Sequence, residues 1–117
     1  MMRFWCSVAW VVIGGAAQAA CPGQSQMEMN DCAAARYAQA DGQLNAVWPT
    51  AKGYMDGLGA GAALLDAQRK WLAYRDATCT SEIAPYGGGS IQPLVWYTCL
   101  ERVTRVRTAE LQDLMRP

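Results

Sequence analysis

The stretch AALLDAQRKWLAYRDATC, residues 62–79, has the residue spacing of an α-helix. Side chains suited to an inner face recur at steps of three and four residues, which places them on one side of a helix. These positions are Leu64, Leu65, Gln68, Trp71, Leu72 and Arg75. Asp66 and Lys70 also form a favourable i,i+4 pair. The pattern predicts a helix from about Ala62 to Cys79.

A longer helix is predicted before this stretch, from about Gln26 to Val47. Ser25 and Glu28 fit a capping box, in which each side chain satisfies the other residue's free main-chain N–H. The positions at helical spacing that follow are Met29, Ala33, Tyr37, Ala40, Leu44 and Val47. Trp48-Pro49 should end or kink this helix, because proline has no N–H. Residues 50–58 leave room for a short further helix before a glycine-rich connection.

A third helix is predicted after a loop at residues 80–89, which contains Pro85 and three consecutive glycines. Ser90 is expected to cap this helix, and Pro93 fits its first turn. The helix should continue to about Leu114. Its expected inner residues are Leu100, Val103, Val106, Leu111 and Leu114. No strand-like alternation is sustained, so we predict a small all-α bundle of three main helices, stapled by disulfides.

The first 19 residues have the features of a cleaved export signal. Arg3 supplies the positive charge, an apolar stretch follows from Phe4 to Ile13, and Ala17 and Ala19 provide the small residues of a cleavage site near Ala19/Ala20. A membrane span would need about 20 apolar residues. We therefore predict a signal peptide at 1–19 and one helical domain at 20–117, periplasmic or secreted from a bacterium. A membrane anchor or a first core helix remains an alternative.

Four cysteines remain after this cleavage, and an exported small domain is expected to oxidise them to two disulfides. Four cysteines allow three pairings. The antiparallel second and third helices should bring Cys79 level with Cys99, and a local Cys21–Cys32 bridge would pin the segment before the first helix. We favour these two pairs. A lipid-anchor signal using Cys21 remains an alternative, although Gln18 stands where such signals usually have Leu.

The 117-residue chain contains no histidine, and its ten basic residues balance ten acidic ones. The absence of histidine excludes Ser-His-Asp and Cys-His catalysis and removes the commonest metal ligand. The balanced charge argues against nucleic acid as a partner. Acidic residues show no spacing typical of a metal site. We predict a protein that is not an enzyme and has no cofactor, no metal and no catalytic residues.

The string from Ala67 to Cys79 resembles the AQRxWxxYRDxxC signature of the LprI-like lysozyme-inhibitor family. Further matches follow in the same order as in the family: Met29-x-x-Cys32, Ala40-Asp41-x-x-Leu44-Asn45, Tyr86-x-Gly88-Gly89-Ser90 and Cys99-Leu100. The resemblance covers nearly all of the chain after the signal. It departs at Pro49 and in the short glycine-rich connection between the first two helices. It implies an exported protein that binds lysozyme, and it supplies no catalytic residues.

The matching residues on the predicted helix allow a structural role and a binding role. They are Gln68, Arg69, Trp71, Tyr74, Arg75 and Asp76. Core packing is the favoured role for Trp71 and Tyr74. For Arg75 and Asp76 we favour a buried polar network or charges at a helix end. Glu101 and Arg105 are interpreted as a solvated i,i+4 pair.

The glycine-rich loop is the candidate contact surface. A tight connection is its simplest interpretation, insertion into a partner's cleft is the second, and a phosphate cradle is weak because the P-loop lysine is absent. Lysozyme carries two catalytic carboxyl groups. Our hypothesis places Tyr86, Gly88, Gly89, Ser90 and a nearby arginine such as Arg75 against them. The alternative is a periplasmic structural or envelope-stress module that binds another envelope protein, with membrane contact only through a lipid on Cys21.

Overall fold

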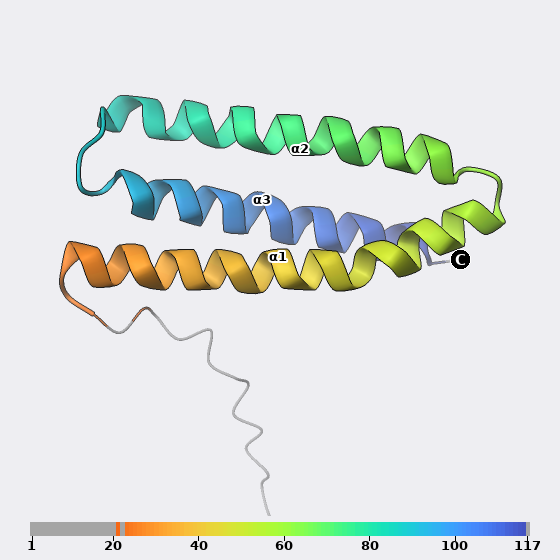
Figure 1. Cartoon of the computed structure of the whole chain (residues 1–117), viewed down its shortest axis with the longest axis horizontal. Helices are drawn as coiled ribbons and strands as arrows, with labels where there is room; N and C mark the ends of the chain where they lie inside the picture. The colour runs from red at the N-terminus through yellow and green to blue at the C-terminus, as the bar shows by residue number, and fades with distance from the viewer. Residues whose placement is uncertain (1–20, 22, 117) are drawn as a thin grey trace, which may run out of the picture.

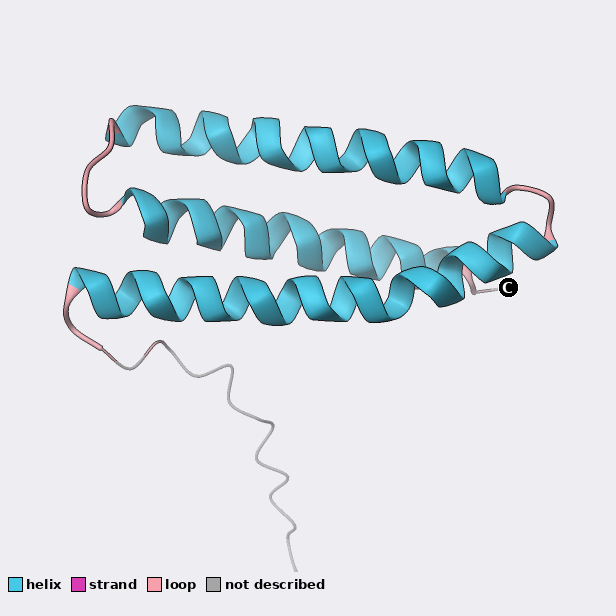
Figure 2. Ribbon diagram, viewed as in Figure 1, coloured by secondary structure: helices cyan, strands magenta, loops and turns pink. Residues whose placement is uncertain are grey.

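The computed structural model describes residues 21 and 23–116, and in this part of the chain all regular structure is helical (Figures 1 and 2). Three long helices, α1 (Gln26–Gly57), α2 (Gly61–Ile83) and α3 (Gln92–Leu114), are joined by short connections. A 3₁₀ helix, η1 (Ala84–Tyr86), follows α2. The prediction of an all-α bundle of three main helices is confirmed. The predicted signal peptide at 1–19 lies outside the described residues.

Helix α1 begins where the capping box predicts. Ser25 is the N-cap, and its hydroxyl oxygen accepts a 3.1 Å hydrogen bond from the main-chain N–H of Glu28. The hydroxyl in turn donates to the Glu28 carboxylate at 3.0 Å. The Glu28 carboxylate therefore accepts a hydrogen bond from the Ser25 side chain, whereas in a full capping box it would accept one from the main-chain N–H of Ser25.

The predicted end of the first helix at Val47 is wrong, because α1 continues through Pro49 to Gly57. Residues 50–58 are therefore mostly the last turns of α1 and do not form a separate short helix. Proline removes one hydrogen bond, but Leu44 and Ala51 on either side of it are both buried in one core cluster, which holds the helix together. Figure 1 shows α1 changing direction in its second half, which agrees with the kink that proline favours.

Two boundaries around the loop also differ from prediction. Helix α2 extends to Ile83, past the expected end at Cys79. Ser90 does not cap α3, whose N-cap is Ile91 without a side-chain bond. The main-chain N–H of Gln92 instead donates a 3.0 Å hydrogen bond to the Gly89 carbonyl, so the chain already forms a turn just before α3 begins. Pro93 lies in the first turn as expected.

Helices α1 and α3 run parallel, and α2 runs antiparallel to both (Figure 1). One core cluster joins the three helices toward the α1–α2 turn; its buried members are Leu44, Ala51, Leu64 and Leu111. A second cluster contains the buried Cys79, Cys99 and Leu100, with Tyr37, Trp96, Tyr97 and Val103 packed against it. The core is thus divided into two parts along the bundle axis.

Three residues predicted on inner faces are exposed: Leu72, Val106 and Leu114. In α3 the inward row at steps of three and four residues is Leu100, Thr104, Thr108 and Leu111. Leu100 and Leu111 were predicted to face inward, whereas Thr104 and Thr108 were not. Helical spacing places a residue in this row whether it is polar or apolar. Within residues 21 and 23–116 no helix is long and apolar enough to cross a membrane.

Candidate partner-binding site

The loop that joins α2 to α3 is held in a defined conformation. Tyr86 to Gly89 form a turn closed by a 2.9 Å hydrogen bond from the Gly89 N–H to the Tyr86 carbonyl. The central residues Gly87 and Gly88 have φ values of +53° and +79°. Positive φ at both central positions is typical of a type I′ turn, which favours glycine because a side chain is strained there.

A side chain from α1 fastens this loop to the bundle. The amide nitrogen of Asn30 donates to the main-chain carbonyl of Ser90 at 2.9 Å. Gln26, one turn earlier, donates to the Asn30 amide oxygen at 2.8 Å, which fixes the orientation of the Asn30 side chain. The parallel arrangement of α1 and α3 makes this possible, because both helices begin at the end of the bundle that carries the loop. We call this end of the molecule the loop end.

A hollow of about 570 Å³ lies at the loop end, between the first turns of α1, the loop and the start of α3. Its lining residues are Gln26, Met27, Asn30, Asp31, Ala34, Gly88, Gly89, Ser90, Gln92, Pro93 and Tyr97. Met27 is 74% exposed, and the neighbouring Tyr86 and Ile91 are also exposed. The hollow thus combines polar amide groups with accessible apolar side chains, a composition suited to contact with a protein.

The hollow contains three of the five residues predicted to bind a partner. Gly88, Gly89 and Ser90 line it, and Tyr86 is exposed two residues away in the same loop. Arg75 is not among the lining residues, because it lies in α2 more than two turns before that helix ends. The other lining residues were not predicted. Only their place in the first turns of two parallel helices brings them together, and the sequence gives no local signal of that.

Both predicted disulfides, Cys21–Cys32 and Cys79–Cys99, are present, with Cα–Cα distances of 5.4 and 5.6 Å. Cys32 and Cys99 lie in the second turns of α1 and α3, and Cys79 lies about one turn before α2 ends. Both crosslinks therefore stiffen the loop end. The Cys21 sulfur is bonded to Cys32, so it is not free to carry a lipid in this form.

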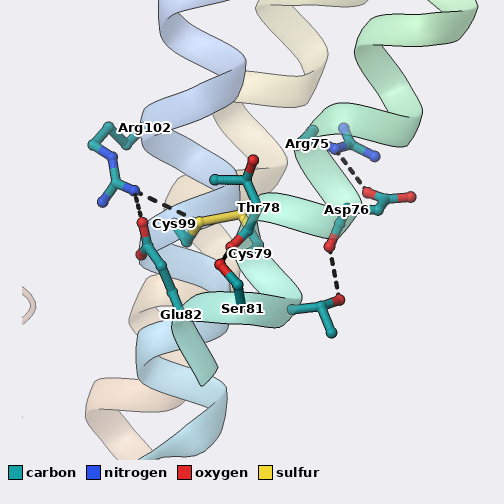
Figure 3. The surroundings of a disulfide bond; sticks show 9 residues. Arg75, Asp76, Thr78, Cys79, Ser81, Glu82, Cys99 and Arg102 are labelled. Atoms are coloured by element: carbon teal, nitrogen blue, oxygen red, sulfur yellow. Dashed lines mark hydrogen bonds and ion pairs between the residues drawn. A yellow bond between two sulfur atoms is a disulfide. The ribbon is translucent and has the colours of Figure 1, made fainter. Parts of the chain in front are cut away.

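Charged side chains surround the second disulfide (Figure 3). Arg102 of α3 forms an ion pair with Glu82 of α2 and places one guanidinium nitrogen 3.7 Å from the Cys99 sulfur. The ion pair and the disulfide join the same two helices just below the loop.

Three of the signature residues on α2 hold the bundle together. Gln68 is buried and accepts a 2.9 Å hydrogen bond from Arg107 of α3. Trp71 packs against the core cluster that contains Leu64. The Arg75 guanidinium lies over two aromatic rings. Its distance from the centroid of the Trp71 ring, in the same helix, is 5.3 Å, and its distance from the centroid of the Tyr37 ring, in α1, is 5.8 Å. The Arg75 side chain is only 12% exposed, which supports the predicted buried polar role.

Burial also affects the Tyr37 hydroxyl beneath Arg75. Desolvation raises the pKa of Tyr37, and the positive charge of Arg75 acts in the opposite direction. Tyr37 also packs against Tyr97 of α3, with ring centroids 6.1 Å apart. Arg75 and Tyr37 therefore join all three helices near the second core cluster.

The remaining signature residues face outward. Tyr74 is 60% exposed, so the expectation that it packs in the core is wrong. It lines a groove of about 270 Å³ between α2 and α3, together with Val106 and Arg102. Arg69 lines a separate groove of about 330 Å³ between α1 and α2. Asp76 is exposed and accepts a 3.1 Å hydrogen bond from Arg75.

Glu101 belongs to a charge network that the sequence did not predict. Its side chain is 12% exposed and lies between Arg36 of α1 and Arg105 of its own helix, at 3.4 and 3.0 Å. The interpretation of Glu101 and Arg105 as a solvated pair is therefore wrong. Packing of α1 against α3 covers the carboxylate and adds the second arginine. Among the described residues no cluster of histidine, cysteine, aspartate or glutamate could hold a metal ion.

The lysozyme inhibitor LprI family matches residues 16–111 of the chain. The chain belongs to this family. The family is described as lysozyme inhibitor LprI. The matched region contains all four disulfide cysteines, the α2 signature and the loop.

A curated relative from Rhizobium meliloti (strain 1021), an uncharacterized protein, is 43% identical over 103 residues. The alignment covers 78% of this chain and 74% of the relative. No solved structure matches the chain. The fold described above is therefore the basis for locating a binding site in this LprI protein.

Proposed function

We propose that residues 1–19 direct export of this LprI protein and that the domain at 20–117 inhibits lysozyme by direct contact through its loop end. The family assignment supports lysozyme as the partner. The domain needs no cofactor or catalytic group for this role. It acts by occupying the cleft of the enzyme, in the periplasm or after secretion.

The rigidity of the loop end is the observation that carries this proposal. Two disulfides, the Arg102–Glu82 ion pair and the Asn30–Ser90 hydrogen bond all lie within a few turns of one loop. A surface that is already ordered loses little conformational entropy when it binds, so more of its contact energy contributes to affinity. No disulfide restrains the opposite end, at the α1–α2 turn, in the described residues.

The chemistry of the loop suits a cleft with two catalytic carboxyl groups. Tyr86 and Ser90 provide hydroxyl groups that can donate hydrogen bonds to carboxylates. Gly88 and Gly89 keep the loop narrow, because they place no side chain at its tip. Arg75 is held between Tyr37 and Trp71, so we no longer include it among the residues that contact lysozyme. In this proposal the Tyr86 and Ser90 hydroxyl groups alone contact the carboxyl groups.

Lysis of bacterial cell walls by lysozyme, followed by turbidity, tests the proposal. Purified protein spanning 20–117, in molar excess, should slow the lysis. Tyr86→Ala should weaken inhibition by about tenfold or more, as expected for a central aromatic anchor. Tyr54→Ala is a matched control, because Tyr54 is 41% exposed, close to the 43% of Tyr86, but lies near the far end of α1. Unchanged lysis with the wild-type protein in excess would disprove the proposal.

A second candidate function is binding to a different envelope protein. The groove between α2 and α3 favours it, because Tyr74 and Val106 expose apolar surface well away from the loop. Capture of one envelope protein by the wild type, lost in Tyr74→Ser and kept in Tyr86→Ala, together with no effect on lysozyme, would favour this second function.

A further inference from the structure

The hollow at the loop end carries a single charge, which is negative. Asp31, an exposed residue, is the one charged group among its lining residues. No ion pair joins Asp31 to another residue in the described part of the chain. The nearby Glu28 carboxylate is already engaged by the Ser25 hydroxyl. Asp31 is therefore a carboxylate available to a partner.

The rest of the lining offers hydrogen-bond acceptors to a partner. Gln26 and Gln92 contribute amide oxygens, and the Asn30 oxygen, which accepts a hydrogen bond from Gln26, keeps a second acceptor position. Tyr97, whose ring also packs against Tyr37, is the one aromatic residue among the lining residues, and an aromatic ring attracts a cation. Because the lining has no basic residue, the Asp31 carboxylate disfavours a phosphate or carboxylate placed next to it. The hollow favours a group that is positive and carries several N–H donors.

We propose that the hollow receives one basic side chain, an arginine, from the surface of lysozyme beside its cleft. The guanidinium is planar and carries five N–H donors, so it can bind the Asp31 carboxylate and a neighbouring amide oxygen together. The volume of about 570 Å³ accommodates the side chain and the main chain that presents it. This inference rests on the proposed function and gives the loop end two contacts of opposite polarity.

The two contacts lie side by side on one rigid surface. Tyr86 and Ser90 donate hydrogen bonds to acidic groups in the cleft of lysozyme. The hollow accepts a basic group from its rim. The pairing fixes the orientation of the complex, because rotating the inhibitor would place Asp31 against the acidic groups.

Calorimetric titration of lysozyme with Asp31→Asn tests the inference. At about 50 mM NaCl we expect this variant to bind about tenfold more weakly than the wild type, with a smaller loss of affinity on raising NaCl to about 300 mM. Asp113→Asn is the control, because it removes an equal charge from the opposite end of α3. Lysozyme binding that is normal in Asp31→Asn would overturn the inference and leave the proposed function intact.

A second measurement does not depend on lysozyme. N-acetylarginine methylamide should shift the side-chain amide NMR signals of Asn30 and Gln92 in the wild type and not in Asp31→Asn. The neutral citrulline counterpart should have little effect. Equal shifts from citrulline, stronger shifts from a short N-acetylglucosamine oligomer, or no response to the arginine compound would overturn the inference. If the wild type does not bind lysozyme, the proposed function fails and this measurement alone decides whether the hollow binds a guanidinium.

Discussion

The side-chain amide of Asn30 donates a 2.9 Å hydrogen bond to the main-chain carbonyl of Ser90, which lies 60 residues later in the sequence. This bond joins the second turn of α1 to the loop before α3. It is the one side-chain hydrogen bond in the described residues that holds the loop at residues 87–91 to α1. The position of the loop therefore depends on it.

Asn30→Ala should loosen the loop and lower the free energy of unfolding by about 1 kcal/mol, the usual net value of one hydrogen bond. Amide hydrogen exchange at residues 87–91 should become faster. Asn45→Ala is the control, because Asn45 bonds only to Asp41 within its own helix. Loop exchange that is as slow as in the wild type would show that other contacts hold the loop.

Gly88→Ala should destabilise the protein by about 1–2 kcal/mol, because Gly88 has a φ of +79° and a side chain is strained in that region. Gly42→Ala should have the opposite effect. It lies inside α1, where an added Cβ meets no atom within 4 Å and alanine favours the helix by about 1 kcal/mol. Urea denaturation measures both, and a shift of the same sign in both variants would contradict the assignment of the turn.

Arg75→Met should lower stability by about 1–2 kcal/mol. Methionine keeps much of the apolar bulk but removes the cation that lies over Trp71 and Tyr37. Arg69→Met, at an exposed position of the same helix, should change stability by less than about 0.5 kcal/mol. Thermal unfolding followed by circular dichroism measures both variants, and equal small effects would exclude an energetic role for the stacking.

Thr104→Val should raise stability by about 1 kcal/mol. The Thr104 side chain is fully buried, and its hydroxyl has no hydrogen-bond partner in the described structure, so the hydroxyl is desolvated without compensation. Thr108→Val is the control, because the Thr108 hydroxyl donates to the Thr104 carbonyl at 3.2 Å. Removal of the Thr108 hydroxyl should not raise the free energy of unfolding. A loss of stability in Thr104→Val on urea denaturation would indicate that the hydroxyl does have a partner.

Stability above pH 10 should depend on Tyr37. Burial raises the pKa of its hydroxyl above the ordinary 10.0, so the folded protein holds this proton more tightly than the unfolded chain. The stability from this difference is complete below pH 10.0 and is lost as the pH rises through the folded-state pKa. Tyr37→Phe should therefore lose stability less steeply above pH 10.0 than the wild type. Tyr54→Phe, at an exposed position, should retain the wild-type slope.

The sequence predicted the number of helices and both disulfides because these depend on local spacing and on short connections. Helical periodicity located α2, and the short connection between α2 and α3 favoured the pairing of Cys79 with Cys99. The prediction that the first helix ends at Val47 failed because it considered only the local effect of Pro49. The buried Leu44 and Ala51 on either side of Pro49 keep α1 continuous.

Three consecutive glycines predicted the loop between α2 and α3, but no sequence feature predicted the hollow beside this loop. Its lining depends on α1 and α3 lying parallel, which places Asp31 and Tyr97 in one site although they are far apart in the sequence. The buried setting of Glu101 depends on the same packing. Contacts between helices that are not consecutive follow from the tertiary arrangement, and a single sequence carries no direct record of them.

Because α1 and α3 begin at the same end of the bundle (Figure 1), Cys21, which is bonded to Cys32 of α1, lies at the loop end, whereas Arg116 follows the last turn of α3 at the opposite end. An affinity tag or a fluorescent protein fused ahead of Cys21 would crowd the loop, whereas the same fusion after Arg116 would leave it open. Immobilisation on a sensor chip through the C-terminus would likewise present the loop to the solution. The direction of the first helix thus determines which terminus is suitable for attachment.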